Sequence, residues 1–188
     1  NISHELRTPL TLIADPIEHI VNDENLTKQQ RNMLQIVEKN VSILMRLVNE
    51  ILDFRKIQNK KMELTLSEFE LTRYLKEWAS TFESIATKRK IKVELITPAP
   101  IRLCADIYKV ERICYNLLSN ALKYTSEGGS ITIKAKSTDE TVEICIKDTG
   151  KGIAKEDIKH IFDRFYQVRN SNKDGTGIGL AIVKAFTE

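Results

Sequence analysis

Two stripes of apolar residues at helical spacing constrain the fold of this 188-residue chain more than any other feature. The first stripe recurs every three to four positions from Ile2 to Val21, as on one face of an amphipathic helix. The second runs from Leu34 to Ile51 in alternating steps of three and four, which is typical of a heptad seam. A polar stretch, residues 22–30, separates the stripes, so the pattern predicts an all-α helical hairpin.

A single hairpin of this kind cannot bury both stripes. We therefore expect two copies of the chain to form a dimeric four-helix bundle. Thr27 is followed three positions later by Gln30, which is the pattern of a capping box. The second helix is therefore expected to begin at this pair.

The periodicity of the apolar residues changes near residue 61. From there on, stretches in which apolar and polar residues alternate are interspersed with stretches of helical spacing. Strands are expected over residues 62–71, 91–96, 101–106, 131–137 and 141–148, and helices over 72–88, 107–124, 158–165 and from 178. Asp106 is a good N-cap for the helix that follows it. This order of elements predicts an α+β sandwich, in which one sheet lies against helices.

Composition excludes several classes of function. The chain is 41% hydrophobic and 29% charged, its net charge is +3, and no basic stripe is interleaved with aromatic residues, so we expect no direct binding of nucleic acid. No apolar run reaches the roughly 18 residues that a bilayer-spanning helix needs. Cys104, Cys114 and Cys145 form no CxxC pair and are odd in number, so we interpret them as buried reduced thiols. The chain also starts inside an expected helix, which indicates a piece of a longer protein.

The stretch SHELRTPLTLI, residues 3–13, carries a candidate nucleophile. On a helical wheel His4 lies about 200° from its apolar neighbours and so points toward solvent, and Thr8 shares its face. An exposed neutral imidazole is a competent nucleophile, and the carboxylate of Glu5 can hold its other ring N–H. Pro9 inside a helix costs roughly 3 kcal/mol or more, which a bend that presents the imidazole would explain. An ordinary surface histidine beside a carboxylate is the alternative reading of the motif.

Three further stretches carry groups that suit a nucleotide. Asn116 and Asn120 lie four apart on one helical face with Lys123 beyond them, and two amide oxygens at this spacing suit a hard cation such as Mg²⁺. DTGKGI, residues 148–153, has a carboxylate at a strand end that can accept from an exocyclic amine. GTGIGL, residues 175–180, opens a helix, where glycines free backbone N–H groups to cradle phosphate. Each motif alone is weak, whereas their order and spacing together are specific.

The motifs in this order resemble the sensor histidine kinases of two-component signalling over nearly the whole chain. SHELRTPL resembles the H box of that family, and residues 116–125 resemble the N box. DTGKGI, IFDRFYQV and GTGIGL resemble the G1, F and G2 boxes. The resemblance implies the fold of that family: a dimeric helical hairpin followed by an ATP-binding domain of the GHKL type.

The resemblance also implies roles for individual residues. His4 would be the phosphoacceptor, Glu5 the adjacent base, and Thr8 the residue that positions water when a partner is dephosphorylated. ATP and Mg²⁺ are the implied cofactors, and the magnesium ion would be held by Asn120 with Asn116. The implied nucleotide-binding residues are Asn116, Asn120, Lys123, Tyr124, Asp148, Gly150, Gly152, Ile153, Arg164, Gly175, Gly177, Gly179 and Leu180.

A lid over residues 154–174, anchored by Phe162 and Phe165, would close over the nucleotide. Gln167 stands where many relatives have a basic residue, so Arg164 or Arg169 would have to supply the γ-phosphate contact.

The implied function is ATP-dependent autophosphorylation on His4 and transfer of the phosphoryl group to an aspartate of a response regulator receiver domain. The alternatives are a response-regulator phosphatase and a docking dimer with little kinase activity. Residues 1–60 would form the dimerisation and phosphotransfer domain, and residues 61–188 an ATP-binding catalytic domain that is C-terminally incomplete. By the same resemblance the chain would be the cytoplasmic portion of a sensor protein anchored in the inner membrane.

Overall fold

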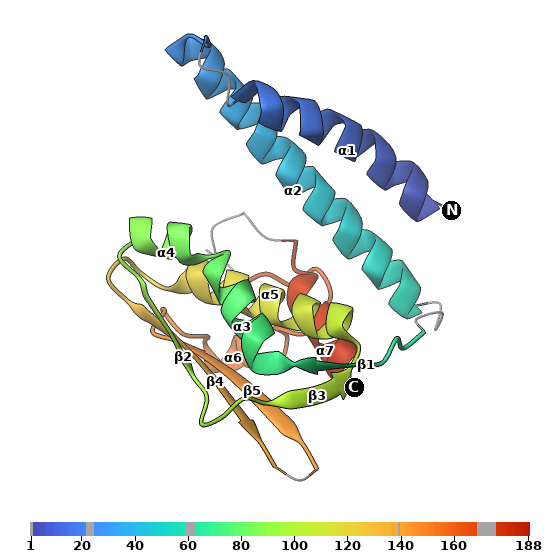
Figure 1. Ribbon diagram of the computed structural model, residues 1–188, viewed down its shortest axis with the longest axis vertical. Coiled ribbons are helices and arrows are strands. Elements are labelled where there is room, and N and C mark those ends of the chain that lie inside the picture. Colours follow the sequence, from blue (N-terminus) through green and yellow to red (C-terminus); the bar gives the residue numbers. More distant parts are fainter. Residues whose placement is uncertain (1, 22–24, 59–62, 139, 169–175) are drawn as a thin grey trace. The chain divides into compact units, whose positions relative to one another are not determined.

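The computed structural model describes residues 2–21, 25–58, 63–138, 140–168 and 176–188. The chain divides into two compact units, Asn1–Met62 and Glu63–Glu188 (Figure 1). The predicted domain boundary between residues 60 and 61 lies outside the described residues. Each unit is considered by itself below.

The first unit is a hairpin of two helices, α1 (Ile2–Val21) and α2 (Lys28–Gln58), which pack along one another (Figure 1). The predicted capping box is confirmed, because Thr27 N donates to Gln30 Oε1 at 3.0 Å and Gln30 N donates to Thr27 Oγ1 at 3.3 Å. Arg31 Nη1 donates to the carbonyl of Val21 at 3.0 Å and so links the start of α2 to the end of α1.

The heptad seam of α2 is only half covered within one hairpin. Its alternate members Leu34, Val41 and Val48 are half-buried. The other members remain exposed: Val37 at 43%, Leu44 at 46% and Ile51 at 47%. A second apolar surface is needed to cover them, in line with the expected four-helix arrangement.

The second unit contains five strands and five helices among its described residues. In chain order they are β1 (Ser67–Glu70), α3 (Leu71–Ser80), α4 (Glu83–Lys88), β2 (Lys92–Ile96), β3 (Arg102–Ala105), α5 (Ile107–Tyr124), β4 (Ser130–Ser137), β5 (Val142–Asp148), α6 (Lys155–Ile158) and α7 (Gly179–Thr187). Strands β2, β4 and β5 form one sheet, in which β2 is parallel to β4 and β4 is antiparallel to β5. Strands β1 and β3 form a separate antiparallel pair.

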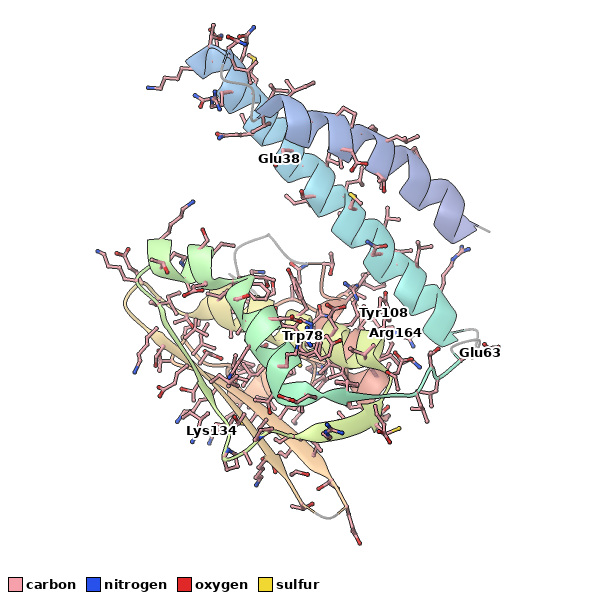
Figure 2. All side chains as sticks on the ribbon, viewed as in Figure 1. Glu38, Glu63, Trp78, Tyr108, Lys134 and Arg164 are labelled. Carbon is pink, nitrogen blue, oxygen red and sulfur yellow. The ribbon has the colours of Figure 1, made fainter. Side chains whose placement is uncertain are left out.

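Helices α3 and α5 cover one face of the β2-β4-β5 sheet, and α7 packs on α5 (Figure 1). Strand β4 alternates accordingly, with Ile131 and Ile133 buried and Lys134 exposed on the opposite face (Figure 2). Trp78 of α3 is buried in the same core. The α+β sandwich predicted from the element order is therefore confirmed.

Two predicted elements have clearly different limits in the structure. The predicted strand at residues 62–71 shrinks to β1, because Thr65 N donates to the side chain of Asp106 at 3.1 Å and not to a neighbouring strand. The single helix predicted over residues 72–88 is divided into α3 and α4. The hydroxyls of Ser80 and Thr81 each donate to a backbone carbonyl three residues earlier at 2.7 Å, which competes with the regular helical pattern.

The helix predicted over residues 158–165 is wrong. The helix of this region, α6, ends at Ile158, and turns follow it. His160 N donates to Asp157 O and Asp163 N to His160 O, both at 2.8 Å, so hydrogen bonds that span three residues follow α6. Ile161 N donates to Asp157 O at 3.1 Å, a four-residue span, but the turns after it do not continue this pattern.

The prediction of three buried thiols holds for Cys114 alone. Burial raises the pKa of the Cys114 thiol to about 12, with a further contribution from the nearby Glu111 carboxylate. Cys104 and Cys145 are exposed, because each takes an outward position in the alternating pattern of its strand. In the described part of the chain, no helix is long and apolar enough to cross a membrane.

Candidate active site

Helix α5 presents the predicted asparagine pair. Asp106 caps its first turn by accepting from Lys109 N at 3.2 Å, as expected from the sequence. Asn116 and Asn120 lie four residues apart on α5 and are half-buried. Asn116 Nδ2 donates to the carbonyl of Arg112 at 2.8 Å.

The N-terminus of α7 closely approaches this asparagine. A Cβ atom at Gly179 would lie 2.6 Å from Asn116 Oδ1, a distance that real Cβ contacts essentially never show. Glycine at this position leaves room for the Asn116 side chain, which a larger residue would have to displace. The structure thus brings together two motifs that are more than sixty residues apart in sequence.

The G1-like loop packs against the C-terminus of α5. A Cβ atom at Gly150 would lie 2.6 Å from the carbonyl oxygen of Tyr124 and 2.6 Å from Asp148 Oδ1. Gly150 N donates to the same Asp148 oxygen at 2.8 Å, which holds the exposed carboxylate at the start of the loop. Gly152 has a φ of +71°, a conformation that favours glycine.

A threonine that sequence reasoning missed ties this loop to the sheet. Thr149 N donates to the carbonyl of Ser130 at 3.1 Å, and Ser130 N donates to Thr149 Oγ1 at 2.9 Å. The signal in the sequence was the hydroxyl residue between Asp148 and Gly150, whose partner is set by the strand register.

Two lysines surround the ring of Tyr124. Lys123 Nζ lies 4.9 Å and Lys151 Nζ 5.6 Å from the ring centroid, within the range of cation–π attraction. Lys151 was not among the predicted residues, although its place between the two glycines of the G1-like loop could have indicated it. Their two ammonium groups favour an anionic ligand at this edge of the unit.

The F-box-like stretch (IFDRFYQV, residues 161–168) and the G2-like stretch (GTGIGL, residues 175–180) contact each other through backbone atoms. Phe165 N donates to the carbonyl of Gly177 at 2.9 Å, and a Cβ at Gly177 would lie 2.6 Å from the carbonyl carbon of Phe165. Phe165 has a φ of +62°, which is unusual for a bulky residue and marks local strain. Phe162 and Phe165 are 41% and 65% exposed, so it is backbone contact that joins the two stretches here.

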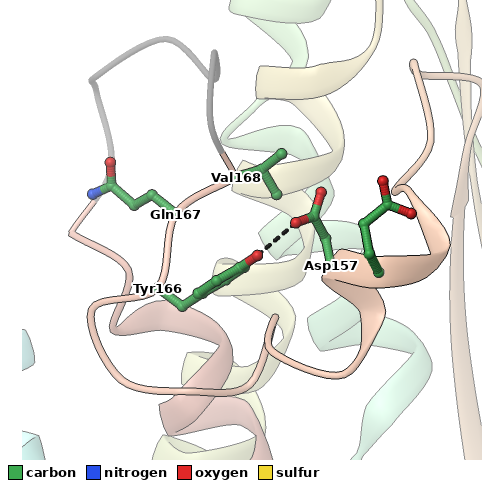
Figure 3. A pocket seen from close by; sticks show the side chains of 5 residues that line it. Asp157, Tyr166, Gln167 and Val168 are labelled. Carbon is green, nitrogen blue, oxygen red and sulfur yellow. Dashed lines mark hydrogen bonds between the residues drawn. The ribbon is translucent and has the colours of Figure 1, made fainter.

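A hollow of about 520 Å³ lies beside α6 (Figure 3). Its lining includes the side chains of Glu156 and Asp157, and Tyr166 OH donates to Asp157 Oδ1 at 2.5 Å. Two carboxylates disfavour phosphate here. This makes the hollow a poor candidate for the nucleotide site expected from the sequence, and leaves the surface formed by α5, the G1-like loop and the start of α7 as the candidate.

The remaining predicted residues divide into two groups. Half-buried Leu180 and exposed Ile153 and Arg164 lie on the same unit as the motifs above. His4, Glu5 and Thr8 lie in α1, but their side chains are outside the described part of the structure, as are Gly175 and residues 169–174 of the predicted lid. Among the described residues no three His, Cys, Asp or Glu side chains gather into a metal site.

Comparison with known proteins places both units in defined families. Residues 1–60 match the His Kinase A (phospho-acceptor) domain, and residues 105–188 match the histidine kinase-, DNA gyrase B- and HSP90-like ATPase family. A curated relative, Histidine kinase P4 of Formosa agariphila, is 37% identical over the whole chain, which spans 14% of that protein.

Solved structures agree with these matches. The crystal structure of full-length ShkA in complex with AMPPNP has a TM-score of 0.77 and 29% identity, covering 99% of this chain and 39% of ShkA. The histidine kinase ThkA in complex with the response regulator TrrA has a TM-score of 0.59 and 27% identity, covering 88% of this chain and 49% of ThkA. With both domain families matched in the order of the histidine kinases, the chain belongs to the sensor histidine kinases of two-component signalling.

Proposed function

We propose that this chain autophosphorylates on His4 with ATP and passes the phosphoryl group to an aspartate of a response regulator. The observation that carries the proposal is the pair of close approaches at Gly179 and Gly150. They bring the G2-like stretch to Asn116 in the middle of α5 and the G1-like loop to Tyr124 at its C-terminus. Three stretches that suit phosphate, cation and adenine thereby form one continuous wall.

In this proposal the surface formed by α5, the G1-like loop and the start of α7 binds adenine through a carboxylate and the phosphates through positively charged and N–H groups. The Asp148 carboxylate accepts from the adenine amine while Gly150 N holds one of its oxygens in place. Lys123 and Lys151 supply positive charge toward the phosphates, and the glycines at the start of α7 let backbone N–H groups approach them. Asn120 and Asn116 would hold Mg²⁺, which neutralises charge on the transferred group when bound.

The phosphoryl transfer itself needs little covalent chemistry from the protein. A ring nitrogen of His4 forms a bond to the γ-phosphorus as the bond to the β-phosphate oxygen breaks, and ADP leaves. Glu5 accepts a hydrogen bond from the other ring N–H and stabilises the charge that develops on the imidazole. The phosphoryl group then moves from nitrogen to a carboxylate oxygen of the receiver domain.

We propose a homodimer as the working form. The support is the exposed half of the heptad seam on α2, which one hairpin leaves uncovered. Residues 1–60 would provide this interface and the phosphoacceptor, and residues 61–188 the nucleotide site. A receiver domain as the partner is supported by the complex of the similar kinase ThkA with its response regulator. We also propose that the parent protein is a membrane-anchored sensor with this chain on the cytoplasmic side.

The test is incubation of the chain with γ-labelled ATP and Mg²⁺, compared with His4→Ala. We expect a label that is labile in acid and stable in base, as for a phosphoramidate, and that disappears in His4→Ala. His19→Gln, which changes another histidine of α1, is the matched control and should keep the label. A label that persists in His4→Ala, or that survives acid, would contradict the proposal.

A further inference from the structure

Arg89 lies outside every motif considered so far but contacts the end of the helix that carries the N-box-like residues. It is half-buried in the turn between α4 and β2. Its Nη1 donates to the carbonyl of Leu122, and its Nη2 donates to the carbonyl of Thr125 at 2.5 Å. The carbonyl of Arg89 accepts from Gly128 N at 3.2 Å, so the residue contacts the chain on both sides of the C-terminus of α5.

These contacts suit an arginine for two physical reasons. The last carbonyls of a helix lack partners within the helix, and a cation near them is also favoured by the helix dipole. The planar guanidinium can donate to two separate carbonyls at once, whereas a lysine ammonium acts as a single point charge. Lys90, the next residue, has a φ of +53°, which turns the chain sharply away after Arg89.

The turn that Arg89 contacts is the one on which the G1-like loop rests. Tyr124 lies between the two carbonyls bound by the guanidinium, and its own carbonyl oxygen would lie 2.6 Å from a Cβ at Gly150. Gly150 in turn donates to Asp148. A displacement of the last turn of α5 would therefore move the carboxylate that is proposed to bind adenine.

We propose that Arg89 is a positioning residue of the nucleotide site, acting through the C-terminus of α5 on Tyr124, Gly150 and Asp148. The inference rests on the proposed function, because it presumes that this site binds ATP. It predicts that loss of the guanidinium weakens nucleotide binding although Arg89 does not itself touch the nucleotide.

The test is calorimetric titration of the whole chain with ATP in Mg²⁺. We expect Arg89→Ala to raise the Kd for ATP about tenfold, and Arg89→Lys to raise it about threefold because one carbonyl is left without its donor. Arg73→Ala is the matched control. Arg73 is exposed on α3 and forms an ion pair with Glu77 at 3.7 Å. The Kd of the Arg73→Ala variant for ATP should equal that of the wild type.

A second readout separates positioning from simple stability. We expect the KM for ATP in autophosphorylation to rise in the variants while the rate at saturating ATP stays near that of the wild type. A lower melting temperature with unchanged Kd and KM would mean a merely structural role and would overturn the inference. If Arg89→Ala does not fold, as judged by the emission of the buried Trp78, Arg89→Lys decides: a wild-type Kd in that variant overturns the inference.

The same titration distinguishes the two proposals. If the wild-type chain binds ATP and the Arg89 variants bind it equally well, the positioning role alone fails. If the wild-type chain does not bind ATP at all, the proposed function fails and the role of Arg89 fails with it.

Discussion

At the scale of single residues, one carbon added at Gly150 should weaken nucleotide binding. In Gly150→Ala the new Cβ would lie 2.6 Å from the Tyr124 carbonyl, which is backbone and cannot move aside cheaply. The loop must shift and carry Asp148 with it. We expect the Kd for ATP to rise at least about tenfold, as measured by calorimetric titration.

Gly128→Ala is the matched control for this prediction. Gly128 is a loop glycine whose Cβ would meet nothing within 4 Å; unlike Gly150 it has a positive φ, +79°. The variant should lose about 1 kcal/mol of stability through backbone strain and keep its affinity for ATP. Equal affinities in the two variants would show that the close approach at Tyr124 is unimportant for the site.

At the scale of elements, the start of α5 depends on Asp106. This carboxylate is only 8% exposed, accepts from Lys109 N at 3.2 Å and Thr65 N at 3.1 Å, and lies 3.7 Å from Lys109 Nζ. We expect Asp106→Ala to lower the free energy of unfolding of the second unit by about 1–3 kcal/mol, because two backbone donors lose their acceptor. Urea unfolding followed by emission of Trp78, the one tryptophan of the chain, measures the change.

Asp106→Asn keeps one acceptor oxygen and should lose less stability than Asp106→Ala. Glu94→Ala removes an exposed carboxylate 3.4 Å from Lys92 Nζ and should change the free energy by under about 0.5 kcal/mol. If all three variants unfold at the same urea concentration as the wild type, the cap does not stabilise α5.

At the scale of the whole molecule, the uncovered half of the heptad seam should govern association. Leu44 is 46% exposed in one hairpin and lies in the middle of that half. Leu44→Glu would bury a carboxylate in the proposed apolar interface, so we expect the dimer dissociation constant to rise at least about a hundredfold. Analytical ultracentrifugation across a concentration series measures it.

Leu64→Glu introduces the same charge at a residue of the second unit that is 67% exposed. It should leave the dimer unchanged, because position 64 lies outside the helical hairpin. A Leu44→Glu chain that remains as dimeric as Leu64→Glu would show that the seam does not form the interface.

Most elements were predictable where a local signal was strong. The capping box at Thr27, the cap at Asp106 and the strand over residues 131–137 each require only neighbouring residues, and each was confirmed. The division of α3 from α4 and the end of α6 at Ile158 were missed. In the first case, side-chain hydroxyls compete with the helical hydrogen bonds, and such competition is not visible in apolar periodicity.

Some residues of the candidate site were predictable from the sequence and others were not. The residue types of the N-box-like and glycine-rich stretches identified the chemistry, whereas Thr149, Lys151 and Arg89 became apparent only in the folded chain. Each of the three has partners 19 to 36 residues away in sequence, or in the case of Lys151 a ring on another element. No local pattern encodes such partners.

Helical periodicity, strand alternation and the spacing of the motifs can all be recognised from the residues, so the hairpin, the α+β order of elements and the family were predictable. Which motif residues meet was not predictable, because it depends on the folded backbone. The approach of Gly179 to the Asn116 side chain and of Gly150 to the Tyr124 backbone is set by packing around α5. The same packing brings Arg89, which follows α4, within hydrogen-bonding distance of the last turn of α5.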